Sequence, residues 1–335
     1  MISVNNFEYI NTRIRRRRAQ MWEGEKLEHL LSAGTLGAIA QQLGLEGSGA
    51  DHFKLEAALV RRQVDETAMI AGFLRGARRR FLDRLLLHYV KENLKVILRL
   101  WAKRRPQSEA EAMVVDLPGE LSLDIGKFFA ASSIEQFLGL IQDPFLAPLA
   151  PRGLKEFKDT GTTFFIEMGL DAGHFMGLKE AGSGLGLADR SSVRPLLAAE
   201  MTGRDVLALL RARLNYGIEL DRMRPFLAVL DDVQAEKLAQ AESVEKARPV
   251  LEFLLGGRVA RGAATISELE VAIWSEIRRT AAAKFRFSLD DLASPASYYY
   301  LKRIELANLI SVIEGVRLGL SREEIRGSLL PRAGA

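Results

Sequence analysis

The segment SYYYLKRIELANLISVIEGVRLGLSREEI, residues 297–325, predicts two helices joined by a tight turn. Gly319 suits the C-terminus of the first helix, because glycine readily adopts the left-handed backbone conformation common at that position. Ser321 suits the N-cap of the next helix, and Leu320 and Ile325 have the spacing of a hydrophobic staple across its start. The segment therefore indicates a helical fold in which a long helix ends at a helix-turn-helix corner.

Two stripes run along the first of these helices. One is apolar at helical spacing and predicts a core-facing side, formed by Leu306, Leu309, Ile310, Ile313, Val316 and Leu320. The neighbouring stripe contains two polar residues and two glycines, in the order Leu301, Glu305, Asn308, Val312, Gly315 and Gly319. The glycines would let another backbone approach closely. We expect Glu305 and Asn308 to lie at the edge of a packed seam, as hydrogen-bonding braces rather than as ligands.

The rest of the chain also favours helices. A Ser or Thr followed by Glu three residues later, which is the pattern of a capping box, occurs at Ser108, Ser132, Thr265 and Ser321. Period-two alternation is scarce, and only residues 113–117 and 162–166 leave the helical assignment in doubt. Six glycines between residues 169 and 186 predict a loop or insertion near 169–190. The predicted fold class is all-α.

The composition is that of an ordinary soluble protein. Of the 335 residues, 48% are hydrophobic and 27% charged, and the net charge of +4 does not by itself indicate a nucleic-acid binder. The absence of Cys excludes disulfides and thiolate chemistry. No stretch reaches the about 18 uninterrupted apolar residues of a membrane span, and the N-terminus lacks the order of a secretory signal. We expect a cytoplasmic protein without a transmembrane segment of its own.

A weak internal repeat organises the sequence. Residues 93–98 and 308–313 share the pattern Asn-Leu-x-x-[Ile/Val]-[Leu/Ile], and residues 222–227 form a degenerate third copy with Arg222 in place of Asn. Each copy follows an acidic residue flanked by aliphatic residues, at Glu56, Glu167 and Glu270. The separations are 37, 55 and 38 residues, and the excess in the middle copy coincides with the Gly-rich segment.

The acidic motif is short, and it also occurs at Leu27-Glu28, Ile134-Glu135 and Leu251-Glu252, so chance stays an alternative. If the repeat is real, it divides the chain into three helical units, namely residues 1–110, residues 111–235 with the Gly-rich insertion, and residues 236–335. We interpret a set of acids and amides as structural braces at equivalent joints, consisting of Glu56, Asn93, Glu167, Glu270, Glu305 and Asn308.

Residues suited to catalysis or metal binding are sparse. The histidines, at positions 29, 52, 88 and 174, have no metal-ligand spacing, and a P-loop is absent. Residues 182–186 lack the third-glycine position and the strand-turn-helix context of a dinucleotide fingerprint. Glu167 and Asp171 could act as paired carboxylates on one helix face, although a solvated or capping acidic face explains them more simply. We predict no catalytic residue, no cofactor and no metal.

Two arginine clusters are the strongest charge runs. Residues 78–80 form one, and the other consists of Arg13, Arg15, Arg16, Arg17 and Arg18. They could meet phosphates or acidic partner surfaces, or they could be the solvated face of helices whose apolar residues lie beside them. The adjacent tyrosines at 298–300 could stack on bases. Neighbouring side chains on a helix point in different directions, however, so a role in the core and at its rim is favoured.

Several short motifs match one protein family. Residues 9–15 are similar to a Tyr-x-x-Ala-Arg-x-Arg opening, with Thr12 as a departure. Further matches lie at residues 93–95, 98–99, 118–119, 166–167, 170–171, 300–301, 305, 308 and 320–321. On these residues the chain resembles, over nearly its whole length, the C subunits of the bacterial and archaeal V/A-type rotary ATPases, which are related to the d subunits of eukaryotic V-ATPases. Val90, where the family tends to have an acid, and Arg222, in place of the middle Asn, indicate a divergent member.

The resemblance implies a funnel-shaped molecule of three similar helical units in a pseudo-threefold arrangement. It implies a non-catalytic rotor adapter that sits on the cytoplasmic end of the membrane proteolipid ring and receives the central stalk subunits in a socket. ATP would be hydrolysed elsewhere in that complex. The alternatives are an unrelated helical scaffold and a nucleic-acid-binding protein that uses its arginine clusters, with an enzyme in third place.

Overall fold

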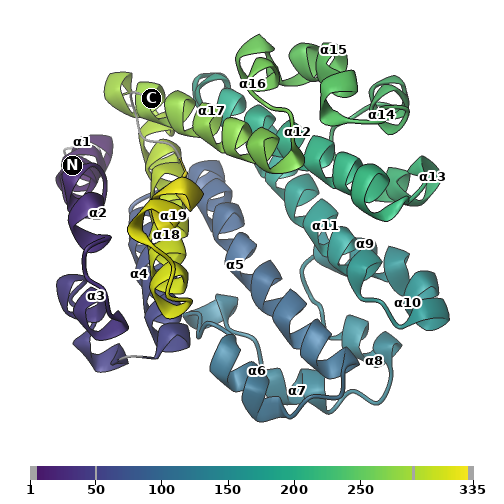
Figure 1. The fold of residues 1–335 in the computed structure, drawn as a ribbon, viewed down its shortest axis with the longest axis horizontal. Coiled ribbons are helices and arrows are strands. Elements are labelled where there is room, and N and C mark those ends of the chain that lie inside the picture. Colours follow the sequence, from purple (N-terminus) through teal and green to yellow (C-terminus); the bar gives the residue numbers. More distant parts are fainter. Residues whose placement is uncertain (1–5, 50, 289–290, 331–335) are drawn as a thin grey trace.

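The computed structural model describes residues 6–49, 51–288 and 291–330, and in these ranges every regular element is a helix (Figure 1). The prediction of an all-α fold is therefore confirmed. Residues 113–117 and 162–166, the two segments with some strand character, contain helix ends and loop but no strand. Within the described ranges, no helix combines the length and the apolar character needed to cross a bilayer.

Six long helices form the body of the molecule. They are α4 (His52–Gly72), α5 (Gly76–Ala102), α11 (Phe164–Ser183), α12 (Leu187–Tyr216), α17 (Ile266–Phe287) and α18 (Ala293–Arg317). The shorter elements are α1 (Asn6–Ala19), α2 (Glu25–Leu30), α3 (Leu36–Gln42), η1 (Glu46–Ser48), α6 (Gln107–Met113), η2 (Gly119–Leu121), α7 (Ile125–Phe129), α8 (Ile134–Gly139), α9 (Leu146–Leu149), η3 (Ala150–Gly153), α10 (Leu154–Thr160), α13 (Leu220–Met223), η4 (Arg224–Phe226), α14 (Asp232–Ala239), α15 (Val244–Leu255), α16 (Gly257–Arg261) and α19 (Arg322–Ser328).

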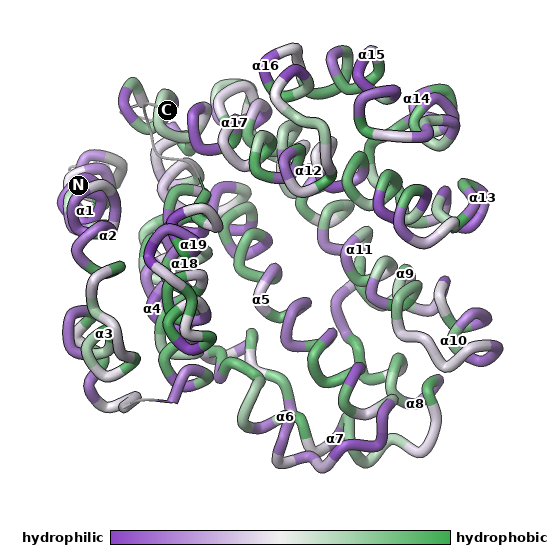
Figure 2. The backbone as a smooth tube through the Cα atoms, viewed as in Figure 1, coloured by the Kyte–Doolittle hydropathy of each residue, from purple (hydrophilic) through white to green (hydrophobic). Residues whose placement is uncertain are grey.

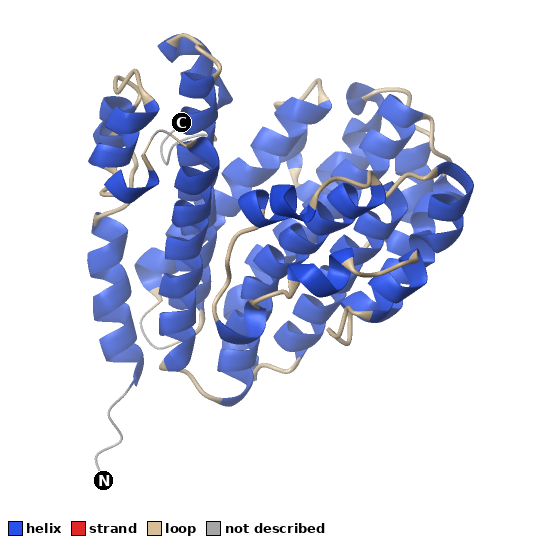
Figure 3. Cartoon of the chain, turned by 90° about the horizontal axis from the view of Figure 1, so that it is seen from below, coloured by secondary structure: helices blue, strands red, loops and turns tan. Residues whose placement is uncertain are grey.

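The long helices pack in a closed order, and the two ends of the chain meet. Helix α4 packs on α5, α5 on α11, α11 on α12, α12 on α17, α17 on α18, and α18 again on α4. Helix α1 also lies against α18, and Arg322 and Arg326 of α19 donate to Glu28 of α2. Figure 3 shows α1 to α4 grouped with α18 on one side of the molecule. The first and last parts of the sequence therefore form one region.

The apolar residues form two cores. The larger runs through all six long helices and includes Phe81, Leu196 and Tyr300. The smaller joins α2, α3 and α4 to α18 and α19, with Leu30 and Val312 among its fully buried members. Figure 2 shows hydrophobic and hydrophilic residues interspersed along each long helix, as amphipathic packing requires. The smaller core is the one that joins the two chain ends.

The Gly-rich segment is not the loop that the sequence predicts. Helix α11 continues to Ser183, and α12 begins four residues later at Leu187. A Cβ atom at Gly169 would lie 2.3 Å from the carbonyl oxygen of Leu149, and one at Gly173 would lie 2.6 Å from that of Phe145. These glycines recur every four residues on one helix face. They are needed because the α9 backbone lies directly against α11, which offsets their low helix propensity.

Helix α18 buries part of the predicted apolar stripe and the neighbouring stripe as well. Leu309 and Ile313 of the apolar stripe are buried in the smaller core, whereas its last member, Leu320, is 42% exposed. The neighbouring stripe of Leu301, Glu305, Asn308 and Val312 is also buried, because α4 and α17 both pack against α18. Gly315 does allow a close approach, since a Cβ there would lie 2.4 Å from Ile325 Cγ1, but the neighbour is a side chain rather than a backbone.

Two of the four predicted capping boxes are confirmed. Thr265 and Ser321 each accept a hydrogen bond from the backbone N–H three residues later, and the backbone N–H of each donates in return to the side chain of Glu268 or Glu324. The prediction at Ser108 is wrong, because α6 begins one residue before it. The prediction at Ser132 is displaced by one, since Ser133 is the residue that caps α8.

The helix-turn-helix corner predicted at Gly319 recurs in the fold. Gly319, with a φ of +69°, follows α18, Gly217 with +62° follows α12, and Arg104 with +53° follows α5. After each of them the next backbone N–H bonds back to a carbonyl in the last turn of the helix, from Leu320 to Gly315, Ile218 to Ala212 and Arg105 to Leu100. The same left-handed cap therefore ends three long helices, with a glycine in two of them.

Replacing Arg104 with glycine is expected to raise the free energy of unfolding by about 0.5–1 kcal/mol, because Arg104 has a Cβ in a backbone conformation that disfavours one. Thermal and denaturant unfolding would measure the change. The matched control is Gly319→Arg, which should lower the stability by a similar amount. An Arg104→Gly variant less stable than the wild type would show that the Arg104 side chain outweighs the backbone term.

Candidate functional site

Two predicted brace residues make the same contact at different places in the chain. Asn93 of α5 donates from Nδ2 to the carbonyl oxygen of Val115 at 2.7 Å, and its Oδ1 accepts from the Val115 N–H at 3.1 Å. Asn308 of α18 makes the same pair of bonds with Leu330, at 3.4 and 2.8 Å. Both partners lie 22 residues further along the chain. Each amide therefore fastens the extended segment that follows a helix-turn-helix corner.

The corresponding residue on α12 is Asp205, which the sequence comparison missed. Its Oδ2 accepts hydrogen bonds from the N–H groups of Ala228, Val229 and Leu230 at 2.8, 2.7 and 3.2 Å. It lies 38 residues after Glu167, as Asn308 lies 38 after Glu270 and Asn93 lies 37 after Glu56. The assignment of the middle copy to Arg222 is therefore wrong, and the irregular spacing of 55 residues disappears.

Each of the three predicted glutamates contacts a long helix at the residue six positions after Asn93, Asp205 or Asn308. Glu167 of α11 accepts from Arg99 Nε at 2.9 Å, and Glu270 of α17 forms an ion pair with Arg211 of α12. Glu56 of α4 lies beside Glu314 of α18, close enough for the Glu314 charge to raise the pKa of Glu56 in addition to the effect of burial. Arg99, Arg211 and Glu314 follow Asn93, Asp205 and Asn308 by six residues. On each of α5, α12 and α18, the brace residue is therefore followed about one and a half turns later by a contact with one of the predicted glutamates.

Asn93→Ala and Asn308→Ala are each expected to lower the free energy of unfolding by about 1–3 kcal/mol, because each leaves a backbone N–H and a carbonyl without their partner. Both side chains are buried. Urea unfolding of the two single variants would measure the loss. Gln107→Ala, which removes an exposed side-chain hydrogen bond on α6, is the control with little expected change. Midpoints unaltered in both Asn variants would contradict the role as braces.

Glu305 has a separate role from the other braces. Its Oε1 accepts a hydrogen bond from the backbone N–H of Trp22 at 2.5 Å, and its other oxygen pairs with Lys302. The side chain is only 2% exposed, so the ammonium group of Lys302 compensates its charge. Glu305 therefore ties the turn after α1 to α18, and it belongs to the region where the chain ends meet.

The arginine cluster on α1 is largely engaged within the molecule. Arg17 pairs with Glu66 and Arg18 with Glu23, at 2.5 and 2.7 Å. Arg15 lies over the Phe285 ring and donates to two carbonyl oxygens at the end of α17. Arg13 donates to the Tyr9 hydroxyl. Arg16 is exposed with no ion pair among the described residues, and with Arg13 it borders a surface hollow.

The three adjacent tyrosines lie entirely in the core, and none of them reaches its rim. Their hydroxyl groups donate in three directions, from Tyr298 to Glu66 on α4, from Tyr299 to the Leu85 carbonyl on α5, and from Tyr300 to Glu200 on α12. Glu200 also pairs with Arg303, and both side chains are nearly buried. The charge of Glu200 raises the pKa of Arg303 above its usual range, against the opposing effect of burial. One turn of α18 is thereby fixed to three other helices.

A cavity of about 380 Å³ lies between α5, α11, α12, α17 and α18. Lys91 and Lys95 of α5 both donate to Asp171 Oδ1 of α11, at 2.7 and 2.6 Å. Burial alone would raise the pKa of Asp171, but the two ammonium groups outweigh it and hold the pKa well below the usual range. Asp171 and Glu167 are thus each neutralised by cations rather than paired with one another, and the reading of them as an acid-base couple is wrong. Burial also keeps the His174 imidazole neutral by lowering its pKa.

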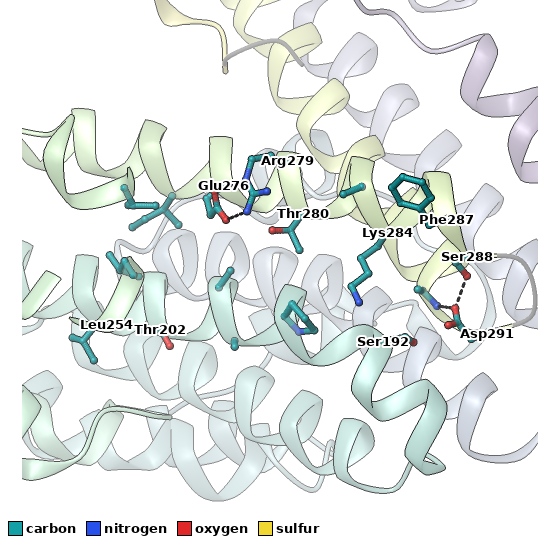
Figure 4. Close-up of a pocket in the computed structure, with 18 residues that line it drawn as sticks. Ser192, Thr202, Leu254, Glu276, Arg279, Thr280, Lys284, Phe287, Ser288 and Asp291 are labelled. Atoms are coloured by element: carbon teal, nitrogen blue, oxygen red, sulfur yellow. Dashed lines mark hydrogen bonds and ion pairs between the residues drawn. The ribbon is translucent and has the colours of Figure 1, made fainter. Parts of the chain in front are cut away.

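A second hollow, of about 680 Å³, lies on the outer side between α12, α15, α16 and α17 (Figure 4). Its polar groups are mostly paired, with Arg279 donating to Glu276 at 2.8 Å and Ser288 donating to Asp291. Lys284 extends from α17 toward α12 across an apolar floor. None of the residues that the sequence singled out lines this hollow. The motifs gather instead at the seams between long helices and along the central cavity.

Comparison with known proteins matches almost the entire chain. The family model described as ATP synthase (C/AC39) subunit matches residues 10–328. A relative from Deinococcus radiodurans, named as the C subunit of a V-type ATP synthase, is 23% identical over 342 residues, an alignment that covers 96% of this chain and 90% of that relative. The matched region contains every seam described above except for Leu330, the partner of Asn308. The likeness is therefore to a whole chain rather than to one of its parts.

Proposed function

The chain belongs to the ATP synthase (C/AC39) subunit family, and we propose that it is a non-catalytic adapter in the central rotor of a V/A-type rotary ATPase. In this role it couples the central stalk subunits to the membrane proteolipid ring, and it sits at the cytoplasmic face of the membrane. The observation that carries the proposal is the family match over residues 10–328, supported by a relative named for the same subunit.

The proposed role requires a stiff body, and the contacts between helices favour one. We propose that residues 1–110, 111–235 and 236–335 are three similar units in a pseudo-threefold, funnel-shaped arrangement. Each would contribute one long helix with a fastened corner, held at Asn93, Asp205 or Asn308. Close packing resists deformation because core side chains interdigitate with few voids. A body braced in this way can transmit torque between two partners without catalysing any reaction.

Partner contacts then fall to charged side chains that the described part of the fold leaves without a counter-charge. On α1 we take these to be Arg13 and Arg16, because Arg17 and Arg18 are in ion pairs and Arg15, which also lacks a counter-charge, donates to carbonyl oxygens at the end of α17. We propose that these two guanidinium groups meet acidic groups of a neighbouring subunit or lipid headgroups at one rim. Exposed charges of this kind would raise the association rate constant and make it salt-dependent, and would contribute less to the equilibrium affinity.

Affinity purification of the tagged chain from membranes of its own cells tests the assignment. We expect stalk and proteolipid subunits to be recovered with it at fixed ratios. We also expect binding to duplex and single-stranded nucleic acid to be absent across a salt titration, whereas a nucleic-acid binder would show a steep salt dependence. Recovery of the chain alone, or with nucleic acid that salt displaces, would contradict the proposal.

A further inference from the structure

The contact between α4 and α18 differs in charge from its two counterparts. Where α11 meets α5, an arginine faces Glu167, and where α17 meets α12, an arginine faces Glu270. Where α4 meets α18, the residue at the arginine position is Glu314, which faces Glu56. This seam is also the one that joins the first and last parts of the chain. Two contacts are therefore permanent ion pairs, and the third places two carboxyl groups together.

We propose that the Glu56–Glu314 contact is a proton-sensitive latch, which holds α4 against α18 while one proton is shared between the two carboxyl groups and loosens when both are charged. A shared proton lets one carboxyl donate to the other. Without it, the groups repel each other across a partly desolvated seam. The buried oxygen Glu56 Oε1 has no hydrogen-bond partner, so no donor stabilises the charged form of this carboxyl at that atom.

The charges around the pair assign the proton to Glu56. Arg317 donates to Glu314 at 3.0 Å and lowers the pKa of Glu314, so that carboxyl stays ionised. Burial and the nearby Glu314 charge raise the pKa of Glu56 to about 7. His52, one turn earlier on α4, lies 4.0 Å from Glu314 and adds positive charge on that side only when protonated.

The other elements near this part of α4 do not offset the repulsion. Helix α3 has no titratable residue, and the titratable residue of η1, Glu46, is exposed. On α6, Glu109 pairs with Arg105, and Glu111 accepts from Gln107. Asp116, in the segment after α6, pairs with Arg61 further along α4, which Asp65 also contacts. On α5, the arginine at position 99 is engaged by Glu167 of α11.

The sign of the pH effect follows from where the proton is bound. In the closed seam Glu56 titrates near pH 7, whereas in an opened seam it returns toward its ordinary value of 4.5. Between these pH values the closed form holds a proton that the opened form releases. Raising the pH through 7 therefore favours opening, and lowering it favours closure. Because Glu56 is only half-buried, solvent screening reduces the effect below that of a fully buried group.

Hydrogen exchange of the full-length chain tests the latch, with rates corrected for the intrinsic pH dependence of exchange. From pH 6 to pH 8, protection of amides in the first half of α4 should fall about tenfold, as expected for a carboxyl pair of this exposure. Amides of α11 and α17 near Glu167 and Glu270 should keep their protection in the same sample. They form an internal control because arginine ion pairs do not titrate in this range.

Three variants complete the experiment. Glu56→Gln and Glu314→Arg should each abolish the pH dependence of α4, the first by fixing a neutral group and the second by restoring the ion pair of the other seams. Arg99→Glu should create a new pH dependence in α11. Wild-type protection that stays constant from pH 6 to 8 would overturn the proposal. An undiminished pH dependence of α4 in the Glu314→Arg variant would also overturn the proposal. This outcome does not depend on whether the Arg99→Glu variant folds.

Discussion

Replacing Glu200 with alanine is expected to lower the free energy of unfolding by about 3–5 kcal/mol, one of the two largest losses anticipated for a single charged residue in this chain. The change leaves the guanidinium group of Arg303 buried without a counter-charge and the Tyr300 hydroxyl without an acceptor. Both groups lie on α18, so α12 and α18 would lose their main polar link. Urea unfolding followed by circular dichroism would measure the loss.

Two controls separate the buried pair from ordinary surface charges. Glu109→Ala removes the partner of Arg105 at an exposed position, and it should change the stability by less than about 0.5 kcal/mol. A double replacement of Glu200 and Arg303 with methionine should be less destabilising than Glu200→Ala, because neither charge is left buried. If Glu200→Ala lost no more than Glu109→Ala, the pair would be solvated in solution.

Asp205→Ala is the second large effect, with an expected loss of about 3–5 kcal/mol. The carboxylate is fully buried, and three backbone N–H groups donate to it. Its removal orphans those donors and leaves Arg204 without its nearest carboxylate. Thermal and urea unfolding would measure the change.

Asp205→Asn is the informative companion variant. It reproduces the residue found at Asn93 and Asn308 and keeps one oxygen that can accept hydrogen bonds. We expect a loss of about 1–2 kcal/mol, smaller than that of the alanine variant. Equal losses in the two variants would mean that charge, rather than hydrogen bonding to the segment at 228–230, accounts for the role of Asp205.

The position of Asp205 shows how far the sequence could guide the repeat. The pattern shared by residues 93–98 and 308–313 begins with Asn followed by Leu. Residues 205–210 read Asp-Val-Leu-Ala-Leu-Leu, which keeps the aliphatic spacing but replaces both leading residues. An aspartate can accept hydrogen bonds from backbone N–H groups as an asparagine does, so the hydrogen-bonding role is kept although the residue type differs. A pattern that allows any side-chain hydrogen-bond acceptor at that spacing includes Asp205.

The sequence predicted helix ends correctly where the capping residue and its hydrogen-bond partner lie close together in the sequence. The boxes at Thr265 and Ser321 and the left-handed cap at Gly319 depend on residues within one turn, and all are present. The Gly-rich segment is helical rather than a loop. Its glycines leave room for the backbone of α9, which lies close in space but earlier in the sequence. Tertiary packing overrode propensity there.

The buried charges could not be predicted for a related reason. Lys91 and Lys95 meet Asp171 across two helices, and Glu200 meets Arg303 from positions 103 residues apart. Nothing in the flanking sequence marks either group, since an isolated lysine or glutamate on a helix usually faces solvent. The predicted acids and amides, in contrast, were found because the repeat placed them at matching intervals.

In its proposed role, this chain couples a rotating stalk to an ion-carrying ring. The most direct measurement compares ATP hydrolysis with ion uptake in vesicles that carry the purified rotary complex, first stripped of this subunit and then given it back. We predict that the stripped complex hydrolyses ATP without pumping, and that adding the wild-type chain restores pumping. Full pumping by the stripped complex would contradict the account.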